Sequence, residues 1–106
     1  MHSPHADHQP LCPHRVRTLP RHFAWVDHRL RDHLARLSLE EIALLFFLHL
    51  VADKHGCSYW SDPAAAKRLG IPCGALSEAR LGLVRKGFVA YRYPVYQILS
   101  VEDPRP

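Results

Sequence analysis

Residues 42–52 are apolar at all but one position, and this run most constrains what the chain can fold into. Ser38 precedes the run as a strong helix N-cap, and Glu41 three residues later completes a capping box. Gly56 is the expected C′ residue, so we predict a helix over residues 39–55. A helix that is apolar on nearly every face must be covered on two sides. It is therefore the central helix of the domain, or part of it faces another subunit.

A short β-prone segment and two further helices follow this apolar helix. Residues 57–60 favour a strand. Ser61 or Asp62 then caps a helix over residues 63–69, which has a proline in its first turn, where the missing N–H costs nothing. After a tight link, residues 73–86 predict a second helix of this pair.

Gly87 ends that helix, and two alternating segments complete the folded part of the chain. Residues 88–93 and 95–101 are typical of strands, and Pro94 separates them, so they predict a short two-stranded antiparallel hairpin. The resulting order is helix, short strand, helix, tight turn, helix and hairpin.

This order, and the residues at its junctions, resemble the winged helix-turn-helix family. Residues 65–72 (AAKRLGIP) are similar to the core of that motif, in which the alanine packs against the third helix and the glycine permits a left-handed turn. Residues 76–79 (LSEA) and 83–89 (LVRKGFV) resemble its recognition helix and the exit of that helix into the wing. The resemblance covers residues 39–100. It implies a mainly α fold with a small β-hairpin, and binding to double-stranded DNA.

The chain has 106 residues, which is the length of one domain. Residues 1–22 contain four prolines, five histidines and three arginines with almost nothing to bury, so we predict a flexible tail. Residues 23–101 form the folded domain, in which leucines within residues 30–37 suit a helical turn or two. Residues 102–106 are a short flexible C-terminus.

The positive charge is concentrated in one part of the sequence. The whole chain carries a net charge of +4. Residues 63–93 contain six basic residues and one acidic residue, which gives this segment +5. Because this segment includes the helix-turn-helix and the hairpin, fold and charge together favour nucleic-acid binding over a merely solvated surface.

The resemblance assigns DNA contacts to three groups of residues. Side chains along the recognition helix would reach base edges in the major groove: Cys73, Gly74, Ala75, Ser77, Glu78 and Leu81. Polar and basic side chains on both helices and the hairpin would bind phosphates: Ser61, Lys67, Arg68, Arg80, Arg85, Lys86 and Arg92. The basic tail would assist through Arg15, Arg17 and Arg21.

The recognition helix lacks strong base-reading side chains in its N-terminal half. Arginine, asparagine and glutamine are missing there, so this helix would form few hydrogen bonds to base edges. Specificity then comes from the tail and from DNA shape, or the domain is an adaptor that keeps the fold. Arg80 stands where the family often has a buried leucine, so an alternative to a phosphate contact is pairing with an acid.

The apolar helix and the segment before it also predict an interface. Winged-helix regulators usually act as dimers, and the phenylalanines of the apolar helix cannot all point into one small core. We therefore expect a homodimer or a stable complex with another protein, through Trp25, Leu30, Phe46, Phe47 and Leu50.

Several other classes of protein are disfavoured. No catalytic motif is present, so we expect no enzyme activity and no cofactor. The histidine and cysteine spacings match no structural zinc pattern, so we expect no metal site. Three unevenly spaced cysteines argue against a disulfide framework and favour a reducing cytoplasmic compartment. The longest apolar stretch, residues 42–48, is about one-third of a membrane span.

The function we expect from these observations is regulation of transcription or replication in a mobile element or a bacterial genome. The alternative is a winged-helix interaction or assembly module that docks a protein through the apolar helix over residues 39–55.

Overall fold

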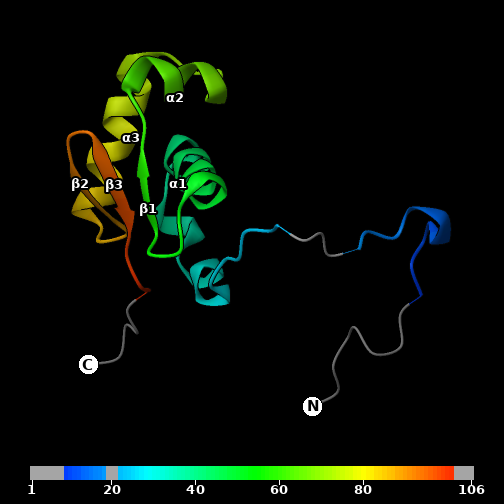
Figure 1. Cartoon of the computed structure of the whole chain (residues 1–106). Coiled ribbons are helices and arrows are strands. Elements are labelled where there is room, and N and C mark those ends of the chain that lie inside the picture. Colours follow the sequence, from blue (N-terminus) through cyan, green and yellow to red (C-terminus); the bar gives the residue numbers. More distant parts are fainter. Residues whose placement is uncertain (1–8, 19–21, 102–106) are drawn as a thin grey trace, which may run out of the picture.

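The computed structural model describes residues 9–18 and 22–101. They form a mainly helical protein with a small three-stranded antiparallel sheet (Figure 1). The predictions for residues 1–8, 19–21 and 102–106 lie outside the described residues. Within the described ranges, no helix reaches the length and hydrophobicity that crossing a bilayer requires.

The helix α1, Leu39–Val51, begins with the predicted capping box. The backbone N–H of Ser38 donates to Glu41 Oε1 at 2.9 Å, and the backbone N–H of Glu41 donates to Ser38 Oγ at 3.1 Å. Two of the free N–H groups at the helix start are thereby satisfied. The cap fixes where α1 begins.

The predicted C-terminal end of this helix was wrong, because α1 ends at Val51 rather than at His55. The carboxylate of Asp53 accepts the backbone N–H groups of His55 (2.8 Å) and Cys57 (3.0 Å). These bonds close a turn through which a helix cannot continue. Gly56, with φ of 83°, lies in this turn.

The next three elements follow the predicted order. Strand β1 is Cys57–Tyr59, helix α2 is Asp62–Leu69, and helix α3 is Cys73–Arg85. Gly70 joins the two helices with φ of 70°, and Gly87 follows α3 with φ of 84°. Both glycines adopt the left-handed conformation that ends a helix at little steric cost.

The sheet contains one strand more than the predicted two-stranded hairpin. Strands β2, Val89–Arg92, and β3, Val95–Ile98, form the expected antiparallel pair. Strand β1 adds to the free edge of β3, with Ser58 opposite Tyr96, and gives the order β1-β3-β2. The prediction therefore missed that β1 attaches the hairpin to the chain between α1 and α2.

The segment before α1 forms short 3-10 helical turns, in line with the helical turn or two that its leucines predict. These turns are His28–Asp32 and Leu34–Arg36. Asp27 caps the first turn, because its Oδ1 accepts the backbone N–H of Arg29 at 2.9 Å. Leu30 and Leu37 from this segment are buried.

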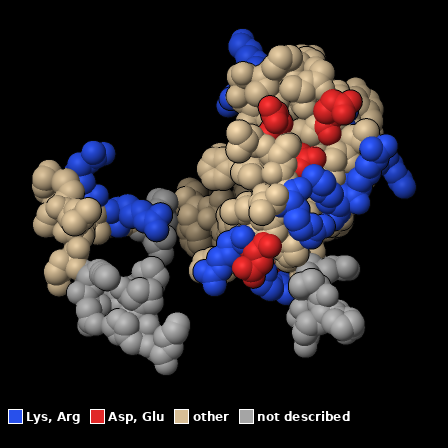
Figure 2. Space-filling view, turned by 180° about the vertical axis from the view of Figure 1, so that it is seen from behind, with Lys and Arg blue, Asp and Glu red and all other residues tan. Residues whose placement is uncertain are grey.

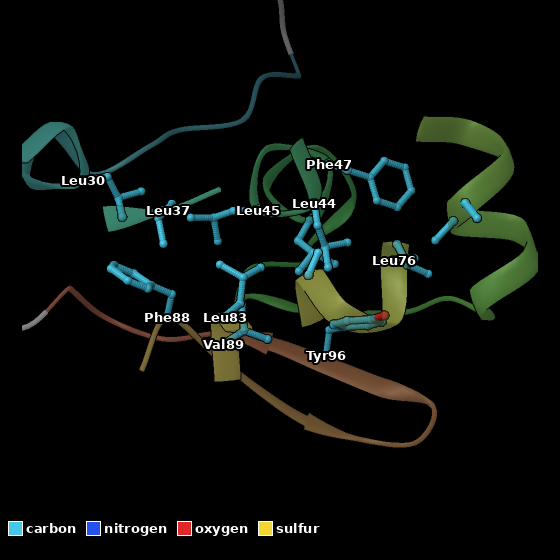
Figure 3. Packing of buried hydrophobic residues seen from close by; sticks show 14 of the residues in the cluster. Leu30, Leu37, Leu44, Leu45, Phe47, Leu76, Leu83, Phe88, Val89 and Tyr96 are labelled. Carbon is cyan, nitrogen blue, oxygen red and sulfur yellow. The ribbon is translucent and has the colours of Figure 1, made fainter. Parts of the chain in front are cut away.

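The core lies between α1, α3 and the sheet. Figure 3 shows side chains from these elements pointing toward one another, with Leu44 of α1, Leu83 of α3 and Tyr96 of β3 at the centre. The fully buried large side chains are Tyr96, Leu44, Leu48, Leu76, Leu83 and Val89. Trp60 closes one end of the core, with its ring edge-on to Phe47 at 4.9 Å between centroids. This packing sets the position of α3.

Candidate nucleic-acid interface

The helix α3 presents one side to solvent. Its opposite side is buried through Leu76, Ala79 and Leu83, which pack in the core. The predicted base-contact residues divide by exposure as follows: Cys73, Gly74, Glu78 and Leu81 are exposed, whereas Ala75 and Ser77 are half-buried. Four of the six candidates therefore lie on the exposed side of the helix.

The exposed side of α3 offers few hydrogen-bonding side chains. The hydroxyl of Ser77 donates to the carbonyl oxygen of Cys73 at 3.1 Å, so its proton is already used within the helix. Leu81 and Val84 add apolar surface to the same helix. Arg85 in the last turn is the one basic side chain of α3 besides Arg80. Few groups remain that form hydrogen bonds to base edges.

Acidic side chains lie beside the N-terminal half of α3. Glu40 of α1 and Glu78 of α3 line a shared shallow hollow, together with Ala75. Both carboxylates are exposed. Because like charges repel, this part of the surface disfavours phosphate. Figure 2 shows acidic and basic side chains interleaved on one face of the molecule rather than one continuous basic patch.

Arg80, a candidate phosphate contact, is already engaged in an ion pair within the protein. Its guanidinium forms a two-point pair with Asp62, with Nη1 to Oδ1 at 2.6 Å and Nη2 to Oδ2 at 3.1 Å. Nη1 also donates to the hydroxyl of Tyr96 at 3.0 Å, and the guanidinium lies 4.3 Å from the ring centroid of Tyr91. The alternative of pairing with an acid is the one observed.

Through these contacts Arg80 joins α3 to α2 and to the sheet. The hydrogen bonds that the Arg80 guanidinium donates to the Asp62 carboxylate raise the pKa of Arg80, so its charge is permanent. Burial raises the pKa of the Tyr96 hydroxyl, which stays neutral and accepts the hydrogen bond. A planar guanidinium is suited to this two-point geometry.

Lys86, another candidate phosphate contact, is also paired with an acid within the protein. Its ammonium donates to Glu41 Oε1 at 2.7 Å and to the carbonyl oxygen of Arg36 at 2.8 Å. Burial raises the pKa of the Glu41 carboxyl, but the bonds from Lys86 and Ser38 outweigh it, and the pKa is lowered overall. Lys86 therefore joins α3 to the start of α1.

The remaining basic candidates are exposed and have no acidic partner among residues 9–18 and 22–101: Lys67, Arg68, Arg85 and Arg92. Arg68 lies over the ring of Trp60, at 5.5 Å from its centroid. Arg80 and Lys86 pair with Asp62 and Glu41, which lie outside residues 63–93. Adding these two acids to the segment lowers its net charge from +5 to +3.

The other candidate contacts have mixed outcomes. Ser61 is the N-cap of α2, and its Oγ accepts the backbone N–H of Ala64 at 3.3 Å, which leaves its hydroxyl proton free to donate. Arg15 and Arg17 are exposed. Arg21 lies outside the described residues. In the described part of the chain, no three histidine, cysteine, aspartate or glutamate side chains gather as a metal site.

The predicted interface residues separate into two groups. Trp25, Phe46 and Leu50 are exposed, at 75%, 60% and 57% of their surface. Leu30 and Phe47 are buried in the core, so their assignment to an interface was wrong. Phe47 faces the core because it lies on the side of α1 that contacts Trp60.

Sequence reasoning missed an apolar groove beside α1. Its lining includes Leu34 from the 3-10 turns and Ile42, Leu45, Phe46 and His49 from α1. The ring nitrogen Nδ1 of His49 is 2.7 Å from the carbonyl oxygen of Leu45, so Nδ1 carries the proton. The leucine spacing before α1 was the signal for this groove.

Comparison with models of protein families, with curated proteins and with solved structures gives no match for this chain.

Proposed function

We propose that this chain is a winged-helix domain that binds double-stranded DNA and regulates transcription or replication. The order α1, β1, α2, α3, β2 and β3 supports the proposal, since it is a helix-turn-helix followed by a hairpin. Such an arrangement presents its second helix to the major groove and its hairpin to the flanking backbone. The sheet order β1-β3-β2 adds support, because β1 holds the hairpin against the helices.

The observation that carries the proposal is a set of exposed basic side chains that have no acidic partner within residues 9–18 and 22–101. Lys67 and Arg68 lie in the last turn of α2, Arg85 lies in the last turn of α3, and Arg92 ends β2. All four are exposed and so able to bind phosphate without first breaking an ion pair. They belong to the three elements that a winged-helix domain turns toward DNA.

The same residues favour binding through the DNA backbone over base reading. The exposed side of α3 offers Glu78 and a hydrophobic Leu81 where base-reading side chains would stand. Phosphate contacts position a protein without reading sequence. Sequence preference then depends on groove width and deformability, with exposed Arg15 and Arg17 of the tail as candidates for a narrow minor groove.

An electrophoretic mobility-shift titration over a range of salt concentrations tests the proposal. Each phosphate contact contributes about 1 to the slope of log affinity against log salt. Arg85→Ala and Arg92→Ala should each lower that slope by about 1 on every DNA sequence tested. Glu78→Gln should raise affinity, because it removes a repelling charge.

Two matched variants complete the test. Arg31 is exposed but belongs to the 3-10 turns, so Arg31→Ala should leave the slope unchanged. Lys86→Ala should lower thermal stability and also leave the slope unchanged, because Lys86 binds Glu41. Absence of any shift at roughly 50 mM salt would sink the proposal.

A protein-docking module is the second candidate, and the exposed apolar side chains of α1 favour it. Phe46 and Leu50 expose more than half of their surface. Large exposed apolar patches mark sites of association. If the chain does not bind DNA but forms a salt-insensitive complex with another protein through these residues, the result would fit this second function.

A further inference from the structure

The outer side of α1 carries a continuous apolar stripe, formed by Leu39, Ala43, Phe46 and Leu50. Leu39 is 80% exposed, Phe46 is 60% exposed and Leu50 is 57% exposed, while Ala43 is half-buried. Their spacing of four, three and four residues is that of the seam of a coiled coil. Leu44 and Leu48, on the opposite side of the same helix, are fully buried.

The stripe is too apolar for a helix face that stays in water. The groove beside it extends the apolar surface through Val26 and Leu34, which are 45% and 43% exposed. Glu40 is the one charged side chain of α1 outside the core, because Glu41 is buried and paired with Lys86. A surface of this kind is expected to be covered.

We propose that α1 pairs with α1 of a second copy of this chain, in antiparallel orientation, around a two-fold axis midway between Ala43 and Phe46. In this register, Leu39 lies opposite Leu50 of the second copy. Phe46 lies opposite Ala43 of the second copy, so a large side chain meets a small one. The stripe is thus complementary to itself, as an interface between identical surfaces requires.

The charges at the two ends of α1 select the antiparallel orientation. The acidic first turn of one helix comes close to Lys54 and His55, which follow the last turn of α1 in the second copy. The carboxylate of Asp53 accepts the backbone N–H groups of His55 and Cys57, and these donors offset part of its negative charge. A parallel pair would place two Glu40 carboxylates together, and antiparallel helix dipoles also attract.

This inference goes beyond DNA binding and is tested without DNA. Sedimentation equilibrium of the full chain at micromolar concentration should give twice the chain mass of 12.2 kDa. Phe46→Asp should raise the dissociation constant of the dimer by about 100-fold, the effect expected for an interface centre. Because Phe46 is exposed, the Phe46→Asp variant should still fold, and its circular dichroism spectrum should match that of the wild type.

Leu81→Asp is the matched control, since Leu81 is a comparably exposed apolar residue on a different helix, at 42%. It should leave the dissociation constant unchanged. A 12.2 kDa species at every concentration would overturn the proposal, and would leave the stripe to another protein or to an apolar small molecule.

A size exchange tests the register itself. Phe46→Ala removes the large side chain, and Ala43→Phe places two large side chains opposite each other, so each single variant should weaken the dimer. The double variant Ala43→Phe/Phe46→Ala restores one large and one small side chain at each contact and should recover most of the affinity. A double variant weaker than both single variants would overturn the antiparallel register.

Discussion

Replacing Gly82 by alanine tests how closely α3 crosses the start of α1. A Cβ atom at Gly82 would overlap Oε2 of Glu41 and would lie 2.8 Å from its Cδ. The Glu41 carboxylate is the flexible end of a side chain, but it is buried and bound to both Ser38 and Lys86. Gly82→Ala therefore forces this carboxylate away from the two groups that it joins.

The expected cost follows from the bonds that are lost. A hydrogen bond to a charged group contributes about 1.5–3 kcal/mol, and an ion pair with an exposed member adds about 0–1 kcal/mol. Alanine favours the helix over glycine by about 1 kcal/mol, which opposes the loss. We expect Gly82→Ala to lower the free energy of unfolding by about 0.5–3 kcal/mol. For a domain of this size, Tm should fall by roughly 2–24 °C.

Differential scanning calorimetry and urea unfolding measure this change, and Gly74→Ala is the matched control. A Cβ at Gly74 meets nothing within 4 Å, so this variant should gain up to about 1 kcal/mol from helix propensity. In a Glu41→Ala background the obstacle is gone, and Gly82→Ala should become stabilising. If Gly82→Ala stabilises the wild-type chain as Gly74→Ala does, the close crossing of α1 and α3 is refuted.

Three further predictions concern stability. Because the pKa of Glu41 is lowered in the folded chain, the ionised carboxylate stabilises the fold above the usual glutamate pKa, and this stabilisation is lost as pH falls below it. In an acid titration followed by circular dichroism, Glu41→Gln should therefore lose less stability with falling pH than the wild type. Arg80→Lys keeps the charge but not the two-point pair, so urea unfolding should show a free energy of unfolding lower by about 1–2 kcal/mol. An unchanged midpoint would mean that the two-point pair does not stabilise the fold. The hydroxyl of Ser58 is buried without a hydrogen-bond partner in the described part of the chain, so Ser58→Ala should leave Tm unchanged or raise it, and a clear fall in Tm would mean that the hydroxyl is bonded.

The features that the sequence predicted well are those decided by neighbouring residues. The capping box needs only Ser38 and Glu41, three positions apart, and both of its hydrogen bonds are present. The left-handed turns at Gly70 and Gly87 likewise depend on residues of one helix end. Local steric and hydrogen-bonding preferences are sufficient for such elements.

The features that it missed depend on residues that are far apart in the chain. The partners of Arg80 and Lys86 lie 18 and 45 positions away, so neighbouring residues do not reveal which acid each side chain pairs with. Phe46 and Phe47 are adjacent and identical, so only the docking of α1 decides which one is buried. The addition of β1 to the sheet is also a long-range pairing.

The exposed side of α3 has one further consequence. Cys73, Gly74, Glu78 and Leu81 are exposed, whereas Leu76, Ala79 and Leu83 of the same helix are buried and pack in the core. Surface substitutions at such positions usually change stability by less than about 0.5 kcal/mol. The helix is therefore a scaffold on which these four positions can be randomised together, and variants with new binding preferences can be selected from such a library without selecting again for folding.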